Sequence, residues 1–512
     1  MQLVDSIARE AVIIESGNIV ISASAGTGKT HTTIERIKSD KQYNYQYFAA
    51  ITFTRKAAKE IRIRLGNDLG RGFVGTNDNF ILSEIIQPFM FDVYGDICKE
   101  GLSPDYSDEN QVSSFEEGIE KAKAYKKICK FNDNRINFSF MLALDILKKS
   151  EAARMYLISK YYRIYIDEYQ DSDRNMHEFF MYISDELGIP LFVVGDEKQS
   201  IYGWRGAYKE GFISLFNKEG FKYFKLIHNF RSVKQIQNYA NIFLPSVRDN
   251  VELTDFNDEV QIARFNTDDE ACIYISKWID RSKNCTFLNF SNDNAKKWAE
   301  HLNENGLDFK YIKASPLDNS NLESEHIWIA RVIAKYFYDK SYSEYDFLDE
   351  AITPEKYKAN KIKDLLDKIV ESVGEKNIYK DNVLEIYKYI GYTEDITKIE
   401  VEIETLYEVL NDNIYRTTYE RRKYMQTCGT IHSSKGLEFK QVIVCGYDYS
   451  FRNDENRFLH YVAVTRPEER LLVILNNTQY SNMYLQEVTK CIGITKEINM
   501  QIDNENIFSI VN

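Results

Sequence analysis

From Ile19 to Thr30 the chain reads Ile-Val-Ile-Ser-Ala-Ser-Ala-Gly-Thr-Gly-Lys-Thr, an apolar strand that runs into a glycine-rich turn. The residues that follow, from His31 to Lys38, have the pattern of a helix. A turn between a strand and a helix points backbone N–H groups at a phosphate, and the helix dipole adds to the attraction. The stretch therefore predicts a nucleoside triphosphate site made of Ala23, Ser24, Ala25, Gly26, Thr27, Gly28, Lys29 and Thr30.

Individual residues of this loop have distinct expected roles. Lys29 is expected to reach the β- and γ-phosphates, and the Thr30 hydroxyl is expected to hold Mg²⁺. Gly26 and Gly28 supply the backbone freedom that the turn needs. Ala23 stands where the first glycine of such loops usually lies, which is a mild departure.

Apolar segments alternate with helical patterns along the rest of the chain. These segments are residues 48–53, 164–166, 191–194, 286–290, 441–444 and 471–474. Alternation of this kind predicts parallel sheets with ligands at the carboxyl ends of the strands. We expect two such halves, the second beginning near Phe224. Charged, mainly helical segments interrupt them at about 80–155 and 330–425.

Two acidic residues, Asp167 and Glu168, directly follow one of the apolar strands. The first carboxylate is expected to bind the metal, and the second to orient and deprotonate the attacking water. A lone Asp-Glu pair is more often a solvated strand end. The phosphate loop upstream and the Gln170-Asp171 that follow favour the catalytic interpretation.

Two arginines of the second half, Arg231 and Arg466, follow apolar segments. Phosphoryl transfer benefits from an arginine at the γ-phosphate, which contributes roughly 10³–10⁵ in rate. If both point across the cleft, the halves must close to hydrolyse the nucleotide, and chemistry is coupled to motion. The alternative for each is a surface ion pair of little energetic weight.

The composition excludes several classes of protein. With 44% apolar and 14% aromatic residues in 512, the chain is globular and too long for a single core. Its net charge of −13 argues against a uniformly basic surface that coats nucleic acid. The cysteines are scattered and form no CxxC pair, which predicts reduced thiols without a zinc or disulfide framework. They lie at positions 98, 129, 272, 285, 428, 445 and 491.

No apolar run approaches the roughly 20 residues that cross a bilayer. The N-terminal segment lacks the pattern of a signal peptide. We therefore expect a cytoplasmic protein that makes no contact with a membrane.

Six motifs stand in one order along the chain. After the phosphate loop come Asp167-Glu168-Tyr169-Gln170-Asp171, Gly195-Asp196-Glu197-Lys198-Gln199-Ser200-Ile201-Tyr202, Asn229-Phe230-Arg231-Ser232, His432-Ser433-Ser434-Lys435-Gly436-Leu437-Glu438-Phe439 and Val462-Ala463-Val464-Thr465-Arg466. The ordered set resembles the UvrD/Rep/PcrA branch of superfamily 1 DNA helicases.

This resemblance implies an α/β fold with two RecA-like P-loop domains on parallel sheets, each carrying a mainly helical insertion. The first domain is expected at 1–80 and 156–222, with its insertion at 81–155. The second is expected at 223–328 and 426–512, including a C-terminal tail, with its insertion at 329–425.

The resemblance also carries over further parts of an ATP site. Gln199 resembles the γ-phosphate sensor, Phe230 the aromatic that stacks on the base, and Glu438 the carboxylate near the ribose. The implied catalytic set is Lys29, Asp167, Glu168, Gln199, Arg231 and Arg466, with Thr30 and Asp167 as metal ligands. His31, Phe230, Arg231, Gly436, Glu438 and Arg466 are the implied nucleotide contacts outside the loop.

Two positions depart from the family pattern. Ala8 falls where relatives usually have a glutamine that reads adenine, and His31 falls where they often have an arginine. Both departures bear on adenine selectivity more than on hydrolysis.

Single strands are held without sequence preference by aromatic platforms and cations, and each stacked base contributes ~1–3 kcal/mol. By resemblance, the strand contacts are Phe53, Thr54, Arg55, Gly75, Thr76, Tyr202, Trp204, Arg205 and His432. Core packing is the alternative for Phe53. Five lysines of the first interruption are expected either to hold duplex phosphates or, more often for such a run, to form one solvated helix face. They are Lys121, Lys123, Lys126, Lys127 and Lys130.

The leading interpretation is an ATP- and Mg²⁺-dependent DNA translocase or helicase that acts on single-stranded DNA or DNA ends, moving 3′ to 5′ by resemblance. One alternative is an ATPase subunit that senses DNA ends or single strands and signals to a partner without unwinding duplex. Another is a stand-alone DNA repair helicase. The compact size and lack of an appended nuclease domain predict a component of a larger system. The chain resembles the helicase-like subunits of the Gabija anti-phage defence complex, which implies a GajA-type nuclease partner in a hetero-oligomer.

Overall fold

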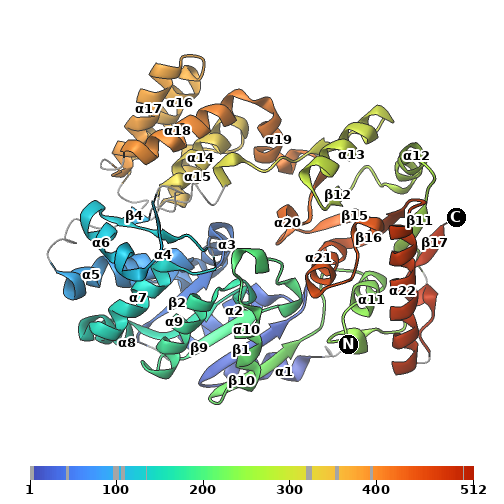
Figure 1. Ribbon diagram of the computed structural model, residues 1–512, viewed down its shortest axis with the longest axis horizontal. Coiled ribbons are helices and arrows are strands. Elements are labelled where there is room, and N and C mark those ends of the chain that lie inside the picture. Colours follow the sequence, from blue (N-terminus) through green and yellow to red (C-terminus); the bar gives the residue numbers. More distant parts are fainter. Residues whose placement is uncertain are drawn as a thin grey trace.

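Two parallel sheets organise the protein in the computed structural model (Figure 1). The structure describes residues 5–41, 45–95, 103–104, 110–133, 135–255, 257–318, 326–351, 357–392, 396–499 and 501–511. The first sheet has strand order β10-β1-β9-β8-β2-β3 and the second β13-β14-β12-β15-β16-β11-β17. Each sheet and the helices that cover it are called the first and the second unit below.

The first sheet is buried on both faces because its strands are apolar at successive positions. Val20, Ile51 and Ile164 face one core, while Ile21, Ala50 and Tyr165 face another. Its strands are β1 (Asn18–Ala23), β2 (Tyr47–Thr52), β3 (Phe73–Thr76), β8 (Tyr161–Ile166), β9 (Leu191–Gly195) and β10 (Phe221–Leu226). Its helices are α1 (Ser6–Ile14), α2 (Lys29–Lys41), α3 (Arg55–Leu65), α9 (Arg174–Asp185) and α10 (Lys209–Ser214).

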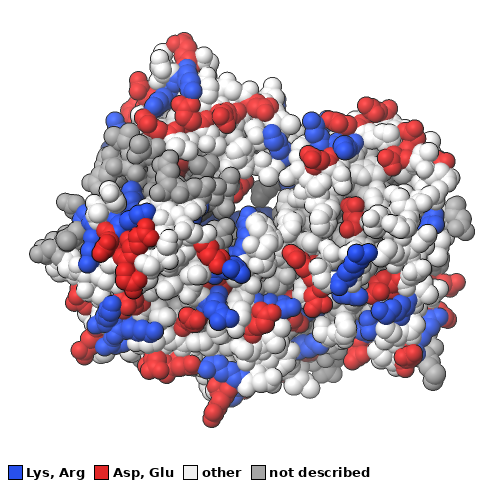
Figure 2. All heavy atoms as spheres, viewed as in Figure 1, with Lys and Arg blue, Asp and Glu red and all other residues white. Residues whose placement is uncertain are grey.

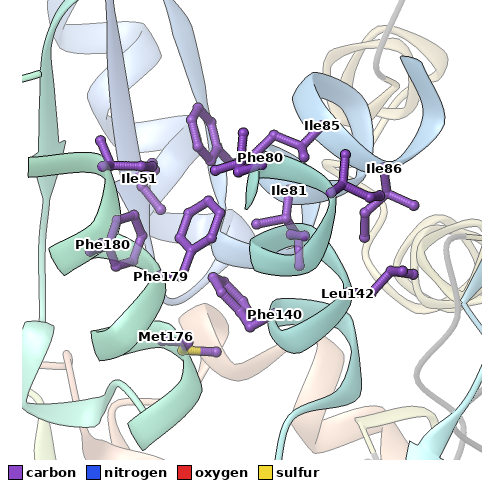
Figure 3. Close-up of a cluster of buried hydrophobic side chains, with 14 of the residues drawn as sticks. Ile51, Phe80, Ile81, Ile85, Ile86, Phe140, Leu142, Met176, Phe179 and Phe180 are labelled. Atoms are coloured by element: carbon purple, nitrogen blue, oxygen red, sulfur yellow. The ribbon is translucent and has the colours of Figure 1, made fainter. Parts of the chain in front are cut away.

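The first insertion lies between Thr76 and Tyr161 and packs directly onto this sheet. Figure 3 shows Phe80 and Phe140 of the insertion in one cluster with Ile51 of β2 and Phe179 of α9. The insertion therefore shares the core of the first unit. Its helices are α4 (Asn77–Ile81), the π-helical turn Leu82–Ile86, α5 (Gln87–Tyr94), α6 (Phe115–Tyr125), α7 (Phe138–Lys149) and α8 (Glu151–Lys160). Its strands are β4 (Ser103–Pro104), β5 (Gln111–Val112), β6 (Lys127–Ile128) and β7 (Lys130–Phe131).

The expected single lysine face does not form in this insertion. Lys121 and Lys123 lie on α6, but Lys127 and Lys130 lie on the short strands β6 and β7. Lys126 ends the helix in a left-handed conformation with φ of 58°. The helix therefore ends at Lys126, and the chain continues in two short strands that pair in parallel with β4 and β5.

The second sheet is also parallel and buried. Its strands are β11 (Val260–Arg264), β12 (Cys285–Asn289), β13 (Lys310–Tyr311), β14 (Gln426–Thr430), β15 (Phe439–Cys445), β16 (Pro467–Leu475) and β17 (Ser509–Val511). The helices around it are α11 (Lys234–Ile242), α12 (Asp268–Trp278), α13 (Asn292–Glu304), α20 (Ile431–Ser434), α21 (Asp454–Val464) and α22 (Gln479–Ile498). Leu288 and Val442 face one core, and Phe287 and Ile443 the other.

The second insertion, between Tyr311 and Gln426, is a helical lobe with a core of its own. It consists of α14 (Ile327–Tyr338), α15 (Glu344–Glu350), α16 (Ala359–Ser372), α17 (Lys376–Ile390), α18 (Ile396–Asn411) and α19 (Arg416–Tyr419). In Figure 1 this lobe, in yellow and orange, lies beside the first insertion. Figure 2 shows a hollow between the lobe and the two units, and cations and acids mixed over this face.

One strand belongs to a different half from the one expected. The apolar segment near Phe224 was predicted to open the second half, but β10 pairs in parallel with β1 at the edge of the first sheet. An edge strand with exposed Lys222 and Tyr223 carries only half the apolar pattern of a central strand, so its sheet could not be assigned. The chain then passes to the second unit through residues 227–232, called the connector below.

None of the described helices is both long and apolar enough to cross a membrane. The six cysteines in the described ranges are free thiols and buried. Cys98 lies outside these ranges.

Candidate nucleotide site and nucleic-acid interface

The loop between β1 and α2 has the conformation that the glycines predict. Gly26 and Gly28 adopt φ of 74° and 78°, in the left-handed region that favours glycine. The Thr27 hydroxyl donates to the Ser24 carbonyl at 2.8 Å and closes the turn. Lys29 and Thr30 follow in the first turn of α2 and His31 is exposed beside them, so the loop surrounds the helix N-terminus.

The pKa values of the two acids at the end of β8 are shifted in opposite directions. Burial and the neighbouring Glu168 raise the pKa of Asp167. Burial also disfavours charge on Glu168, but Lys29, Lys435 and the Gln170 amide outweigh it and lower its pKa. Glu168 lies 3.5 Å from the Lys29 ammonium, so the group expected to act as base is held ionised beside the phosphate loop.

Glu168 also has a strained backbone. Its φ of 53° is in the left-handed region, which is uncommon for a residue with a side chain. Such conformations cost of order 1–3 kcal/mol and gather at functional sites. Here the conformation turns the carboxylate back toward Lys29 and Gln170.

A chain of hydrogen bonds joins the acids to the sensor glutamine. Gln170 donates to Glu168 Oε2 at 2.5 Å and accepts from the Asp196 N–H at 2.9 Å. The buried Asp196 carboxylate accepts from the Gln199 amide at 2.7 Å and pairs with Lys198 at 2.6 Å. The Gln199 side chain is therefore fixed in orientation.

Arg466 of the second unit and Arg231 of the connector both face the phosphate loop. Arg466 is fully buried and donates to Gln199 Oε1 at 3.1 Å. Arg231 pairs with Glu438 and donates to the Thr465 carbonyl. Burial and the nearby Arg231 lower the pKa of Arg466 to about 10, with Glu168 acting in the opposite direction. The two guanidinium groups lie close enough to repel each other, and only Arg231 is paired with a carboxylate, that of Glu438. The excess positive charge makes this a site suited to an anion.

The units meet at the phosphate loop itself. A Cβ placed on Gly26 would come within 2.2 Å of Asn229 Oδ1 and 2.8 Å of Arg231 Cβ. The Phe230 N–H donates to the Gly26 carbonyl at 2.9 Å. On the other side, Ala25 and Tyr461 of α21 line the same small pocket. The phosphate loop thus lies between the connector and α21.

The donor set at this site fits a nucleotide with Mg²⁺. A hydroxyl and a carboxylate, Thr30 and Asp167, are the hard oxygen ligands that Mg²⁺ prefers. Within the described ranges no group of three His, Cys, Asp or Glu residues could enclose a metal alone. Mg²⁺ commonly takes one or two protein oxygens and completes its shell with phosphate oxygens and water, which two such side chains would suit.

The aromatic side chain expected to stack on the base is available for it. Phe230 is 58% exposed at the junction between the units. Ala8 packs against the core of the first sheet and offers no polar group to a base. Gly436 adopts φ of 75° in the loop that carries Glu438, and the Glu438 carboxylate is turned to Arg231.

Aromatic rings from both units line one continuous path. Phe53 and Tyr202 stack with centroids 6.3 Å apart, and Tyr202 lies 6.0 Å from His432 of the second unit. Trp204 meets His432 edge-on at 6.4 Å and is 59% exposed. Phe53 belongs to none of the described core clusters and is 36% exposed, which disfavours core packing for it.

The remaining expected strand contacts lie at the carboxyl ends of β2 and β3 and beside the rings. Thr54 and Thr76 cap α3 and α4 through their hydroxyls, while Arg55 and Gly75 adjoin them. The Arg205 guanidinium lies 4.5 Å from the Trp204 ring centre and 5.6 Å from that of Tyr202.

Comparison with known proteins agrees with this geometry. Residues 4–87 and 93–220 match the UvrD/REP helicase N-terminal domain, and residues 334–478 match the UvrD-like helicase C-terminal domain. Gabija protein GajB of Bacillus cereus (strain VD045) is 37% identical over 496 residues, which cover 95% of this chain and 98% of that protein. The chain belongs to the UvrD-like helicase family.

More distant relatives share part of the chain with this UvrD-like helicase. ATP-dependent DNA helicase PcrA of Bacillus subtilis (strain 168) is 26% identical over 39% of this chain and 33% of its own length. DNA helicase II of Escherichia coli (strain K12) is 25% identical over 41% of this chain and 35% of its own length. The chain thus spans about a third of these larger helicases. Membership of the family identifies it as a DNA-dependent ATPase of the helicase class.

Two further side chains of this UvrD-like helicase contact the site, and the sequence analysis assigned no role to either. Lys435, quoted within a motif but given no role, donates to both Asp171 carboxylate oxygens at 2.6 and 2.9 Å and lies 4.6 Å from the Tyr202 ring centre. Arg9, one residue beyond Ala8, lies 5.0 Å from the Phe230 ring centre. Motif membership could have flagged Lys435, whereas only the folded connector brings Arg9 to Phe230.

Proposed function

We propose that this UvrD-like helicase is an ATP- and Mg²⁺-dependent translocase that moves 3′ to 5′ on single-stranded DNA and works with a nuclease in anti-phage defence. The observation that carries the motor assignment is the Arg466–Gln199 hydrogen bond, which joins the expected finger of one unit to the expected sensor of the other. Closure of the units and completion of the hydrolytic site are then one event.

Each residue contributes a defined step to hydrolysis. The loop N–H groups and Lys29 bind and orient the phosphates. Glu168, held ionised, takes a proton from the attacking water, and Gln199 orients the γ-phosphate. Arg231 and Arg466 stabilise the charge that develops on the transferred group. Thr30 and Asp167 would hold Mg²⁺, which neutralises phosphate charge when bound.

Two variants test the hydrolytic roles. Lys29→Ala should abolish turnover and weaken ATP binding, because it removes the main cation at the phosphates. Glu168→Gln should abolish turnover yet retain ATP, because only the base is lost. Turnover by purified protein and binding of a fluorescent ATP analogue measure the two effects. Unaltered ATPase in Glu168→Gln would refute the base assignment.

Partnership with a nuclease rests on the similarity to Gabija protein GajB over nearly the full length of both chains. We expect the protein to co-purify with the nuclease that is its Gabija partner and to displace a strand from a 3′-tailed duplex. The same duplex with a 5′ tail tests polarity. Hydrolysis without strand displacement, with and without the nuclease, would favour an ATPase that senses DNA ends or single strands. Displacement without any binding to the nuclease would favour a stand-alone helicase.

A further inference from the structure

Arg9 is held rigidly beneath the ring expected to receive the nucleobase. Its guanidinium donates to both carboxylate oxygens of Asp5, at 2.7 and 3.1 Å. It also donates to the Thr27 carbonyl of the phosphate loop at 3.0 Å. The Arg9 side chain is only 15% exposed, so little freedom remains to it.

The partner of Arg9, Asp5, ties this arrangement to the connector. Its carboxylate accepts from the backbone N–H groups of Ile227 and His228 at 2.8 and 2.9 Å. Arg9 also donates a hydrogen bond to the His228 carbonyl at 3.4 Å. The N-terminal helix, the phosphate loop and the connector therefore meet at one ion pair.

The ring of Phe230 is supported on one side and open elsewhere. The Arg9 guanidinium lies 5.0 Å from its centre, and the His228 ring meets it edge-on at 4.6 Å. More than half of the Phe230 side chain nevertheless remains exposed. A cation beneath an aromatic ring is attracted to it and limits its movement.

We propose that Arg9 is a positioning residue for the nucleobase: it holds the Phe230 ring from beneath, so that the base of the bound triphosphate stacks on the open side. This inference rests on the proposed stacking role of Phe230. In this role Arg9 contributes to binding of the base. That contribution is the same in the ground state and in the transition state, so Arg9 takes no part in the chemical step.

The test is to measure KM and kcat for ATP separately in Arg9→Met. This substitution keeps roughly the length of the side chain but removes its charge. KM for ATP should rise about three- to tenfold while kcat stays within about twofold, the signature of lost uniform binding. Glu10→Gln, an exposed change on the same helix, is the matched control and should leave both unchanged. If Arg9→Met does not fold, Arg9→Lys is measured in its place, because it keeps the charge but loses the flat guanidinium. The same rise in KM with little change in kcat is then expected.

A ligand without a base separates this role from a merely structural one. Inorganic tripolyphosphate should inhibit wild type and Arg9→Met with the same inhibition constant, because it does not reach Phe230. Equal weakening of ATP and tripolyphosphate would mean that Arg9 acts on the phosphate loop through Thr27, and would overturn the inference. So would an unchanged KM for ATP.

A double-mutant cycle links Arg9 to the ring itself. If Arg9 acts through Phe230, Arg9→Met should raise KM much less in a Phe230→Leu background than in the wild type. Equal effects in both backgrounds would contradict the inference. Failure of the wild-type protein to hydrolyse ATP with DNA would instead contradict the proposed function, so the two failures are distinguishable.

Discussion

The Lys435 ammonium lies 2.6 and 2.9 Å from the two carboxylate oxygens of Asp171, and this ion pair joins the second unit to the first. Both partners are largely buried, with 11% and 2% of their side chains exposed. The same ammonium donates to the Gln199 carbonyl and lies over Tyr202. One cation therefore touches the acidic motif, the sensor segment and the aromatic path.

Removal of this cation should be costly. Burial already raises the pKa of Asp171 to about 6, against the attraction of Lys435. Lys435→Met leaves that carboxylate buried and unpaired, so we expect a loss of about 3–5 kcal/mol in the free energy of unfolding. Denaturant unfolding measures it, and DNA-stimulated ATPase should fall with it.

Two further variants serve as controls for the Lys435→Met measurement. Lys440 pairs with Glu468 and Glu469 on the surface, so Lys440→Met should cost less than about 1 kcal/mol. Adding Asp171→Asn to Lys435→Met should recover part of the loss, because no buried charge then remains unpaired. A double variant as unstable as the single one would mean that packing, and not charge, explains the effect.

Trp204→Ala should separate the two forms of ATPase activity. The ring is exposed and meets His432 edge-on, so its loss leaves the nucleotide site untouched. A lost base stack of ~1–3 kcal/mol should weaken single-stranded DNA binding roughly five- to 150-fold. Basal ATPase should stay near wild type while the DNA concentration for half-maximal stimulation rises. Equal loss of basal and stimulated activity would remove Trp204 from the strand path.

Gly26→Ala should hold the units apart. The added methyl would overlap Asn229 and Arg231 of the connector, and φ of 74° disfavours any side chain. Gly28→Ala has the same backbone strain, with φ of 78°, but its Cβ meets nothing closer than 3.9 Å. Small-angle scattering should give a larger radius of gyration for Gly26→Ala only. The same radius for both variants would argue against steric separation.

The Asp5 carboxylate should make stability depend on acid pH. Burial opposes its charge, but Arg9 and the N–H groups of Ile227 and His228 lower its pKa below the ordinary 3.8. A lowered pKa contributes stability that is present above about pH 4 and is lost as pH falls through the folded-state value. Asp5→Asn should be less stable at neutral pH, and its difference from wild type should shrink below pH 4. Urea unfolding across this range measures both; a constant difference would exclude the ion pair as the cause.

Much of the nucleotide site could be predicted because its chemistry is encoded locally. The loop from Ala23 to Thr30 and the acids after β8 are short segments whose residue types specify both backbone shape and ligand. The two α/β halves followed from alternation of strands and helices. The family resemblance also assigned Phe53, Tyr202 and His432 to one strand path, and their rings lie together in the structure.

Long-range relationships were beyond such reasoning. The sheet to which β10 belongs depends on hydrogen bonds with β1, about 200 residues earlier in the chain, and a half-exposed edge strand does not reveal its partner. The Lys435–Asp171 pair spans a separation of 264 residues. Arg9 meets Phe230 only because the connector returns to the N-terminal helix. Each of these contacts is a product of topology and not of local pattern.

The placement of β10 in the first sheet makes the connector short, and Phe230 lies within it. A base stacked on that ring would touch the segment that joins the two sheets. We therefore expect nucleotide occupancy and the relative orientation of the two units to depend on each other.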